Sequence, residues 1–180
     1  MEYYSLRGFF AIGAEGISKP MNLGNLMRSA HAFGASFVFT IDAHKKLEAP
    51  GSDTSNAPSH IPYYQWQKIS DMQLPRSCQL VGVELLDEAV DLPSFRHPLQ
   101  AAYVLGPERG SLSPELIHKC DHIIKIPTSF CINVATAGAI IMYDRIKTIG
   151  RFAEPPVTAS GKPVELKLHH HGTPHIRKSG

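Results

Sequence analysis

The sequence predicts an α/β fold in which a mainly parallel β-sheet is flanked by helices. Short apolar runs alternate along the chain with segments of helical period, which is the order that parallel sheets require. Turns rich in glycine, proline and polar residues separate these segments. A chain of 180 residues is long enough to bury one core. We therefore expect one domain over residues 1–150 and a separate tail over residues 151–180.

The first third of the chain predicts a strand, a helix and a second strand. Residues 9–13 form a short apolar run that ends in glycine. Asn22 offers an N-cap side chain for the helix, and Gly34 is a suitable residue to end it. Between them, apolar side chains recur at helical spacing: Leu23, Leu26, Met27, Ala30 and Phe33. The apolar residues 36–41 predict the second strand.

The middle of the chain predicts a long loop and three further strands. Residues 42–60 are rich in Ser, Pro, Gly and Asn and predict an irregular loop. A weaker strand is expected at residues 61–66, where Pro62 restricts it to a sheet edge or a strand end. Apolar runs at residues 80–85 and 101–105, each followed by a polar turn, predict two buried strands.

The last part of the domain predicts a short helix, a strand and the longest helix. Ser113 and Pro114 supply the capping hydroxyl and the first-position proline of a helix that ends near Cys120. Residues 122–127 predict a strand, and residues 133–149 predict the long helix.

The first half of that long helix is expected to be buried on all sides, because no charged side chain occurs from residue 130 to residue 143. Three of its residues are small enough for another helix to approach closely: Ala135, Gly138 and Ala139.

The composition excludes several classes of protein. No apolar stretch approaches the roughly 20 residues of a transmembrane helix, and the first residues lack the layout of a signal peptide. The three cysteines show no C-x-x-C spacing, so neither a disulfide framework nor a zinc site is expected. We predict a cytoplasmic protein that needs no membrane and no metal.

The C-terminal tail differs from the domain in its charge. Residues 151–180 carry five Lys or Arg side chains and two Glu, a net charge of +3, whereas the preceding 150 residues have a net charge of −1. The tail also contains four histidines and four prolines. Such a composition buries little apolar surface. The tail is either a basic arm that contacts phosphates or a solvated extension.

Three segments that follow strands combine small and polar residues, and ligands of α/β sheets bind at such positions. The first segment begins at Asn22. Asn25 and Arg28, three residues apart, share the helix face opposite the apolar stripe. A guanidinium held beside an amide suits the binding of phosphate or carboxylate. From spacing alone, a solvated arginine on a surface helix is the plainer interpretation.

The second segment has the sequence L-G-P-E-R-G over residues 105–110. Gly106 and Gly110 permit the backbone to come close to a ligand, and Glu108 can accept hydrogen bonds from a hydroxyl or an amine. Taken alone, this segment is better explained as an ordinary strand-to-helix turn. The segment contains neither a phosphate-binding P-loop pattern nor G-x-G-x-x-G.

The third segment links the last strand to the long helix over residues 126–135. Asn133, at the start of an apolar helix, is interpreted either as its cap or as part of a site. Cys131 is consistent with a small core hydrophobe. No nearby histidine or second cysteine points to nucleophilic or metal chemistry at its sulfur.

In this order, the three segments resemble the SPOUT superfamily of RNA methyltransferases, and within it the SpoU/TrmH-like branch that methylates ribose 2′-hydroxyls of tRNA and rRNA. The family's N-x-G-N-x-x-R-S motif is met by Asn22, Gly24, Asn25, Arg28 and Ser29. Its L-G-x-E-x-x-G motif is met, with the last glycine one place early, by Leu105, Gly106, Glu108 and Gly110. Its third motif, I-P followed by S-x-N-v-s/a-x-A, is met by Ile126, Pro127, Asn133, Val134, Ala135 and Ala137. The likeness spans residues 8–150.

This resemblance implies a C-terminal deep trefoil knot, the cofactor S-adenosyl-L-methionine and an RNA substrate. A tRNA is favoured over rRNA because the chain resembles the minimal members of the family. The residues implied to hold the cofactor are Leu85, Gly106, Glu108, Ile126, Cys131 and Asn133. A homodimer is also implied, in which Arg28 of one subunit completes the site of the other and the small residues of the long helix serve the dimer contact.

The resemblance also implies a catalytic set, which consists of Arg28, Asn22, Asn25, Glu108 and Asn133. A guanidinium rarely gives up its proton. We therefore interpret Arg28 as binding the phosphate beside the target ribose and stabilising the developing alkoxide. The other four residues would fix Arg28 and the surrounding loops.

The sequence departs from the family pattern in two places. The family often has serine where this chain has Cys131, and the link from Pro127 to Asn133 is shorter than in many members. These departures leave open the alternative that the chain is a knotted protein that binds RNA but has lost catalysis. Another alternative is that it is a SPOUT enzyme that methylates bases instead of ribose.

Overall fold

The computed structural model describes residues 8–44 and 61–150 of the chain. Most of the loop expected at residues 42–60 and the whole tail at residues 151–180 lie outside the described residues. The division into a domain and a tail therefore stays a prediction.

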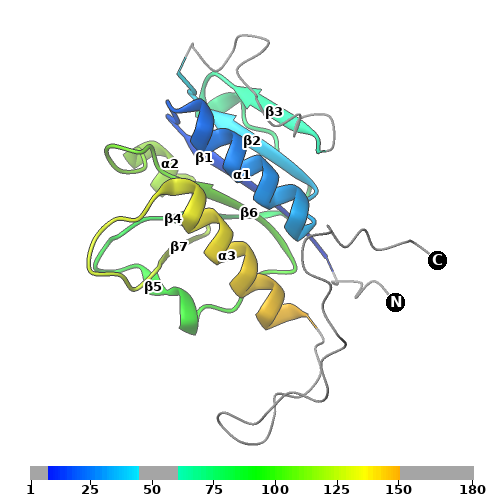
Figure 1. Ribbon diagram of the computed structural model, residues 1–180, viewed down its shortest axis with the longest axis vertical. Coiled ribbons are helices and arrows are strands. Elements are labelled where there is room, and N and C mark those ends of the chain that lie inside the picture. The colour runs from blue at the N-terminus through cyan, green and yellow to red at the C-terminus, as the bar shows by residue number, and fades with distance from the viewer. Residues whose placement is uncertain (1–7, 45–60, 151–180) are drawn as a thin grey trace, which may run out of the picture. The chain divides into compact units, whose positions relative to one another are not determined.

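Seven strands form one sheet in the order β3-β2-β1-β6-β4-β7-β5 (Figure 1). Every neighbouring pair runs parallel, which confirms the predicted parallel sheet. The strands are β1 (Phe9–Glu15), β2 (Phe37–Ile41), β3 (Tyr63–Trp66), β4 (Gln79–Val83), β5 (Val90–Asp91), β6 (Gln100–Leu105) and β7 (His122–Lys125). The strand with Pro62 just before it, β3, lies at a sheet edge as predicted, and the two-residue β5 at the other edge was not predicted.

Within residues 8–44 and 61–150, three α-helices accompany the sheet: α1 (Pro20–Phe33), α2 (Pro114–Lys119) and α3 (Val134–Ile149). The connections of this described part also hold the single-turn 3₁₀ helices η3 (Ile69–Asp71) and η4 (Leu92–Ser94). In Figure 1, α1 and α3 run side by side across the sheet. Among the described residues there is no helix long and apolar enough to cross a membrane.

The central strands are apolar on both sides because helices cover both faces of the sheet. Ile12 of β1 belongs to the core beneath α1 and α3, which contains Leu26 and Met142. Its neighbour Ala11 belongs to the core on the opposite face, which contains Leu116 of α2. Successive residues of a strand thus serve alternate cores, as the pleat requires.

The short helix α2 forms as its sequence predicts. Ser113 is the N-cap residue, and its side chain accepts a hydrogen bond from the Leu116 backbone at 3.2 Å. Gly34 ends α1 in the left-handed conformation, with φ 75°, which suits glycine. Asn133 caps α3 by accepting hydrogen bonds from the backbone of Ala135 and Thr136.

The predicted N-cap of α1 was wrong. The helix begins at Pro20, and Lys19 occupies the N-cap position without a side-chain capping bond. Asn22 lies within the first turn, where it is 7% exposed, so its side chain is buried and available for contacts with other segments. A proline at the first helical position moved the start of the helix three residues earlier than the asparagine indicated, from residue 23 to residue 20.

The expectation that the first half of α3 is buried on all sides was also wrong. Thr136, Ile140 and Tyr143 form an exposed stripe on this helix. Gly138 faces α1 of the same chain, where a Cβ atom on it would lie 2.4 Å from Leu26 Cδ1. This small residue therefore serves a contact within the chain, and a role of the small residues in a dimer contact stays a prediction.

Candidate functional site

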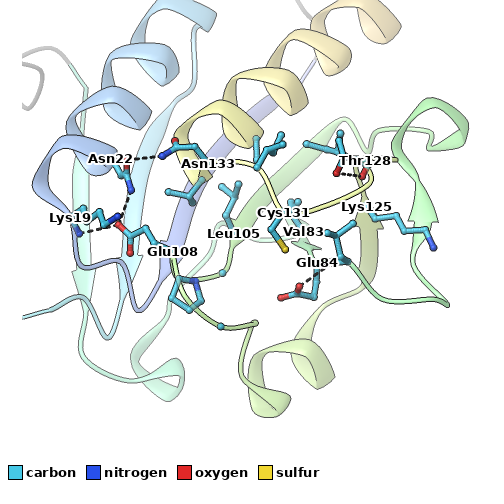
Figure 2. Close-up of a pocket in the computed structure, with 18 residues that line it drawn as sticks. Lys19, Asn22, Val83, Glu84, Leu105, Glu108, Lys125, Thr128, Cys131 and Asn133 are labelled. Carbon is cyan, nitrogen blue, oxygen red and sulfur yellow. Dashed lines mark hydrogen bonds between the residues drawn. The ribbon is translucent and has the colours of Figure 1, made fainter.

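A pocket of about 330 Å³ lies at the carboxyl ends of β4, β6 and β7, between the first turns of α1 and α3 (Figure 2). All three predicted segments contribute to it, through Asn22, Glu108 and Asn133. The volume is at the lower end of the range that is usual for small-molecule sites. The three segments, remote in sequence, therefore meet around one cavity.

Glu108 joins the loop after β6 to the start of α1. Its Oε1 accepts hydrogen bonds from the Lys19 backbone and from Asn22 Nδ2, both at 2.9 Å. Its Oε2 accepts from the backbone and the hydroxyl of Ser18, both at 3.0 Å. The free N–H groups at the start of α1, which lack a local cap, thus meet a carboxylate from another element.

These contacts also keep Glu108 ionised. Partial burial acts to raise the pKa of this carboxyl, but the hydrogen bonds donated by Asn22, Ser18 and Lys19 outweigh burial and lower it below the ordinary value. The carboxylate is consequently a fixed negative charge beside the pocket.

Asn22 carries the connection onward to α3. While its Nδ2 donates to Glu108, its Oδ1 accepts a hydrogen bond from Asn133 Nδ2 at 3.0 Å. Asn133 in turn caps α3 through its own Oδ1. Figure 2 shows this continuous chain of side chains from Glu108 through Asn22 to Asn133 along one wall of the pocket. We refer to these three residues as the relay.

Two further carboxylates hold the loop between β6 and α2. Glu84, directly after β4, accepts a hydrogen bond from the Leu112 backbone at 2.7 Å, and Glu15, at the end of β1, binds both the backbone and the hydroxyl of Ser113. Sequence reasoning missed both residues. The sequence feature that could have identified them is an acidic side chain directly at the carboxyl end of an apolar strand.

The structure places every predicted cofactor-binding residue at the pocket. The lining includes Leu85, Gly106, Glu108, Ile126, Cys131 and Asn133. Gly106 is closely packed, because a Cβ atom there would lie 3.2 Å from the Leu112 backbone nitrogen. Sequence reasoning missed two lysines of the lining, Lys19 and Lys125. Lys125 Nζ donates to the backbone carbonyls of Leu86 and Asp87, which fixes the turn after β4.

Arg28 and Asn25 lie away from this pocket. Both are exposed on α1 and neither lines the cavity, so the chain does not bring its own Arg28 into its own pocket. Both residues lie on the exposed face of the helix, as predicted. Their catalytic roles stay a prediction.

A buried polar network at the opposite end of the sheet was not predicted. Arg145, only 3% exposed, donates to the carbonyls of Phe9, Pro98 and Leu99 and to the hydroxyl of Tyr103. His97 bridges Tyr103 and Asp144, at 2.6 and 3.0 Å. Burial raises the pKa of Tyr103 to about 12, so its hydroxyl stays neutral. The network ties α3 to the amino ends of β1 and β6.

The chemistry of the pocket favours an organic ligand with apolar and charged parts. Val83, Leu105 and Ile132 supply apolar walls, and the lining also carries two carboxylates, Glu84 and Glu108, and two lysines, Lys19 and Lys125. No group of three or more metal-ligating side chains is placed to hold a metal ion within residues 8–44 and 61–150.

Comparison with protein families gives one match. The model described as the SpoU rRNA Methylase family matches residues 10–143, which contain the whole relay. A curated relative, tRNA (guanosine(18)-2'-O)-methyltransferase TARBP1 from Mus musculus, is 30% identical over 156 residues, or 78% of this chain. The chain spans only 10% of that protein, and 55–59% of the bacterial relatives that match it at 24–26% identity.

Comparison with solved structures gives the same fold. The SpoU methyltransferase AviRb from Streptomyces viridochromogenes, in complex with the cofactor AdoMet, matches with a TM-score of 0.68 at 21% identity. The match covers 78% of this chain and 58% of that one. A structure described as giving insights into the 2-OH methylation of C/U34 on tRNA matches with a TM-score of 0.66 at 20% identity, and covers 78% of this chain and 91% of that one.

Proposed function

Because the chain belongs to the SpoU rRNA Methylase family, we propose that it transfers a methyl group from S-adenosyl-L-methionine to a ribose 2′-hydroxyl of RNA. The observation that carries this proposal is the relay, which joins the three motif segments around one pocket. Three polar segments that meet around one cavity indicate a ligand-binding site, because a protein that serves only as a scaffold does not require such an arrangement.

The pocket residues fit the proposed cofactor. Its walls combine apolar side chains for a purine ring with both acidic and basic side chains for the charged groups of an amino-acid moiety, and Gly106 lies among the lining residues. We assign Leu85, Gly106 and Ile126 to hold the cofactor, and Glu108 and Asn133 to fix the loops around it. When bound, the cofactor supplies an electrophilic methyl group on its sulfonium. The chain itself would orient the two reactants, and orientation is a large part of catalysis.

Arg28 is the residue that we assign to the RNA. Its guanidinium would bind the phosphate beside the target ribose and stabilise negative charge on the 2′-oxygen as the proton leaves. Asn25, on the same exposed face of α1, would hold Arg28 in position. Asn22 would act indirectly, since it fixes the first turn of the helix that carries both residues.

The role that we assign to Arg28 requires a homodimer. Within its own chain Arg28 lies outside the pocket, so a second copy is required to bring the guanidinium to a bound cofactor. Large apolar side chains on α1 and α3 are exposed and available for such a contact: Met21, Ile140 and Tyr143 are 77%, 37% and 61% exposed. We therefore propose that two copies pair through these helices and share residues between their sites.

The trefoil knot belongs to the same proposal. The order of the sheet places β6 between β1 and β4, with β7 beyond β4, so these neighbouring strands of the sheet are not consecutive in the sequence. The pocket is lined by the loops that follow β4, β6 and β7, which are the segments that a knot would hold together.

We favour tRNA as the substrate and the cytoplasm as the compartment. Relatives from Mus musculus and Escherichia coli are named as tRNA (guanosine(18)-2'-O)-methyltransferases. The structural neighbour described in connection with position 34 of tRNA is matched over 91% of its length, so it is similar in size. The three cysteines are free thiols, which suits a reducing compartment.

The test is methyl transfer by the purified protein. Pooled unmodified tRNA transcripts or rRNA are incubated with isotopically labelled S-adenosyl-L-methionine, and the digested nucleosides are analysed by mass spectrometry. We expect label in a 2′-O-methyl nucleoside of tRNA. Arg28→Ala should abolish transfer and retain cofactor binding, whereas Arg76→Ala, another exposed arginine, should leave transfer unchanged.

Other outcomes would overturn parts of the proposal. Label in a methylated base would assign the chain to base modification. Label confined to rRNA would refute the tRNA assignment. RNA binding without methyl transfer, together with no binding of the cofactor, would identify a knot protein that has lost catalysis.

A further inference from the structure

Two aromatic side chains stand together on the edge strand β3, outside the pocket. Tyr64 and Trp66 lie two residues apart, so their side chains project from the same face of the strand. Their ring planes differ by 7° and their ring centroids are 6.2 Å apart. Tyr64 is 49% exposed, although its ring is one of the larger apolar groups of the chain. The proposed methyl transfer uses neither residue.

Two phenylalanines of the neighbouring strand β2 hold the rings in place from the side. Phe37 contacts the Tyr64 ring edge-on, with centroids 5.5 Å apart, and Phe39 packs against Trp66 at 5.4 Å. Phe37 and Phe39 are themselves buried in the core of the α2 face. The aromatic pair is therefore fixed before any partner binds, which reduces the entropy that binding would cost.

The pair lies at the carboxyl end of its strand, as the pocket does for β4, β6 and β7, but on the sheet face that α2 covers, whereas α1 and α3 cover the opposite face. In the strand register, Trp66 pairs with Ile41 and Ile41 pairs with Glu15, the last residue of β1. The next strand, β6, ends at Leu105 in the pocket lining. Three strand spacings of about 4.8 Å separate β3 from β6, or roughly 14 Å. An RNA strand of a few nucleotides spans that distance.

We propose that Tyr64 and Trp66 form a stacking platform for an unpaired base of the substrate RNA, a few nucleotides from the methylated ribose. This inference rests on the proposed function. Flat, parallel aromatic rings bind the π-face of any base. The side chains that follow the pair are polar and one is cationic, since Gln67 and Lys68 are exposed. These polar neighbours suit a nucleotide better than an apolar peptide, and the ammonium group of Lys68 can bind the phosphate of that nucleotide.

Trp66 provides a direct readout because it is the sole tryptophan of the chain. Titration with pooled unmodified tRNA transcripts should quench its fluorescence in a saturable manner. Tyr64→Leu, which keeps the apolar contact with Phe37, should raise the Kd for tRNA about tenfold, in line with the energy of base–aromatic stacking. Tyr64→Phe should bind as the unaltered protein does.

Salt dependence and a matched variant distinguish base stacking from a phosphate contact or a general loss of binding. The slope of log Kd against log salt concentration should be the same for Tyr64→Leu and the unaltered protein, because no phosphate contact is lost. Gln65→Ala, on the opposite face of the same strand, is the matched control and should leave the Kd unchanged. Binding of S-adenosyl-L-methionine by all variants should match the unaltered protein.

The outcomes distinguish this inference from the proposed function. If the unaltered protein binds and methylates tRNA, yet Tyr64→Leu binds equally well or Trp66 fluorescence does not respond, the stacking platform alone is refuted. A change in oligomeric state on Tyr64→Leu would show instead that the pair contacts a second copy of the chain. If the unaltered protein binds no RNA, the proposed function fails and this inference fails with it.

Discussion

The carboxylate of Glu108 receives four hydrogen bonds from Ser18, Lys19 and Asn22, all at 2.9–3.0 Å. A residue of the second motif thus caps the helix that carries the first motif. This arrangement makes the geometry of the pocket depend on one side chain. It also explains how α1 begins without a local cap.

Glu108→Gln should therefore destabilise the fold and weaken cofactor binding together. A glutamine removes the charge and turns an N–H₂ group toward donors, so we expect a loss of about 1–3 kcal/mol in the free energy of unfolding. Chemical denaturation measures this loss, and calorimetry measures the affinity for S-adenosyl-L-methionine. Glu88→Gln, an exposed acid, is the control. Unchanged stability and affinity in Glu108→Gln would contradict the capping role.

His97 predicts a pH dependence at the opposite end of the sheet. Burial lowers the pKa of His97 below its ordinary value, although the hydrogen bond and charge of Asp144 act against this shift. The fold thus favours neutral His97. The resulting stabilisation is present above the unfolded pKa of about 6.5 and is lost as pH falls through the lower folded pKa.

His97→Gln removes this titration while it keeps a hydrogen-bonding side chain. The free energy of unfolding of the unaltered protein should fall below about pH 6.5 more steeply than that of the variant. Denaturation midpoints measured from about pH 4.5 to about pH 8 test the difference. Parallel curves for the two proteins would show that His97 does not couple protonation to folding.

At the scale of elements, apolar spacing predicted most of the structure. The stripe from Leu23 to Phe33 located α1, and Ser113 located the start of α2, because these signals are local. Asn22 was assigned the wrong structural role for the opposite reason. Its partners, Glu108 and Asn133, lie 86 and 111 residues away in the sequence, and no local pattern reports such contacts.

Burial of individual side chains on α3 was harder to predict. A run without charge predicts burial, yet Ile140 and Tyr143 are exposed in the single chain. Conversely, Arg145 is buried although arginine is rarely found inside proteins without partners. Its partners are backbone carbonyls and Tyr103, which the sequence does not bring together.

The contact between α1 and α3 gives a prediction for Gly138. Because a Cβ atom there would lie 2.4 Å from buried Leu26, Gly138→Val should overpack this contact and cost about 1–3 kcal/mol of the free energy of unfolding. Thr136→Val places the same side chain on the exposed face of the same helix and should be nearly neutral. Thermal unfolding compares the two. Equal stabilities would show that α3 does not pack closely on α1.

At the scale of the whole molecule, the family motifs predicted more than periodicity did. Strand alternation predicted a parallel sheet, whereas the order of the strands could not be read from spacing. The motifs identified the residues that meet at the pocket, such as Gly106 and Cys131, before the fold was known. The trefoil knot is implied by the resemblance alone and stays a prediction, since untangled connections are the rule in proteins.

The exposed stripe of α3 predicts how the molecule assembles. Tyr143→Lys introduces a charge into the proposed dimer contact and should convert a dimer into a monomer without loss of the fold. Sedimentation velocity measures the change, and circular dichroism checks the fold. Leu99→Lys, at an exposed apolar residue outside α1 and α3, should leave the dimer intact. A monomeric unaltered protein would contradict the proposal that Arg28 acts across two subunits.

The segments joined by Glu108, Asn22 and Asn133 are proposed to form the binding site of a sulfonium cofactor, and methyl transfer depends on that site. Isothermal titration calorimetry of the purified full chain with S-adenosyl-L-methionine tests it most directly. We predict saturable binding in the micromolar range with one cofactor per chain, and a weakening of about tenfold by Asn133→Ala. The assignment of this site would be contradicted if titration with millimolar S-adenosyl-L-methionine gave no detectable heat of binding. Equal affinity of Asn133→Ala and the unaltered protein for the cofactor would also contradict it.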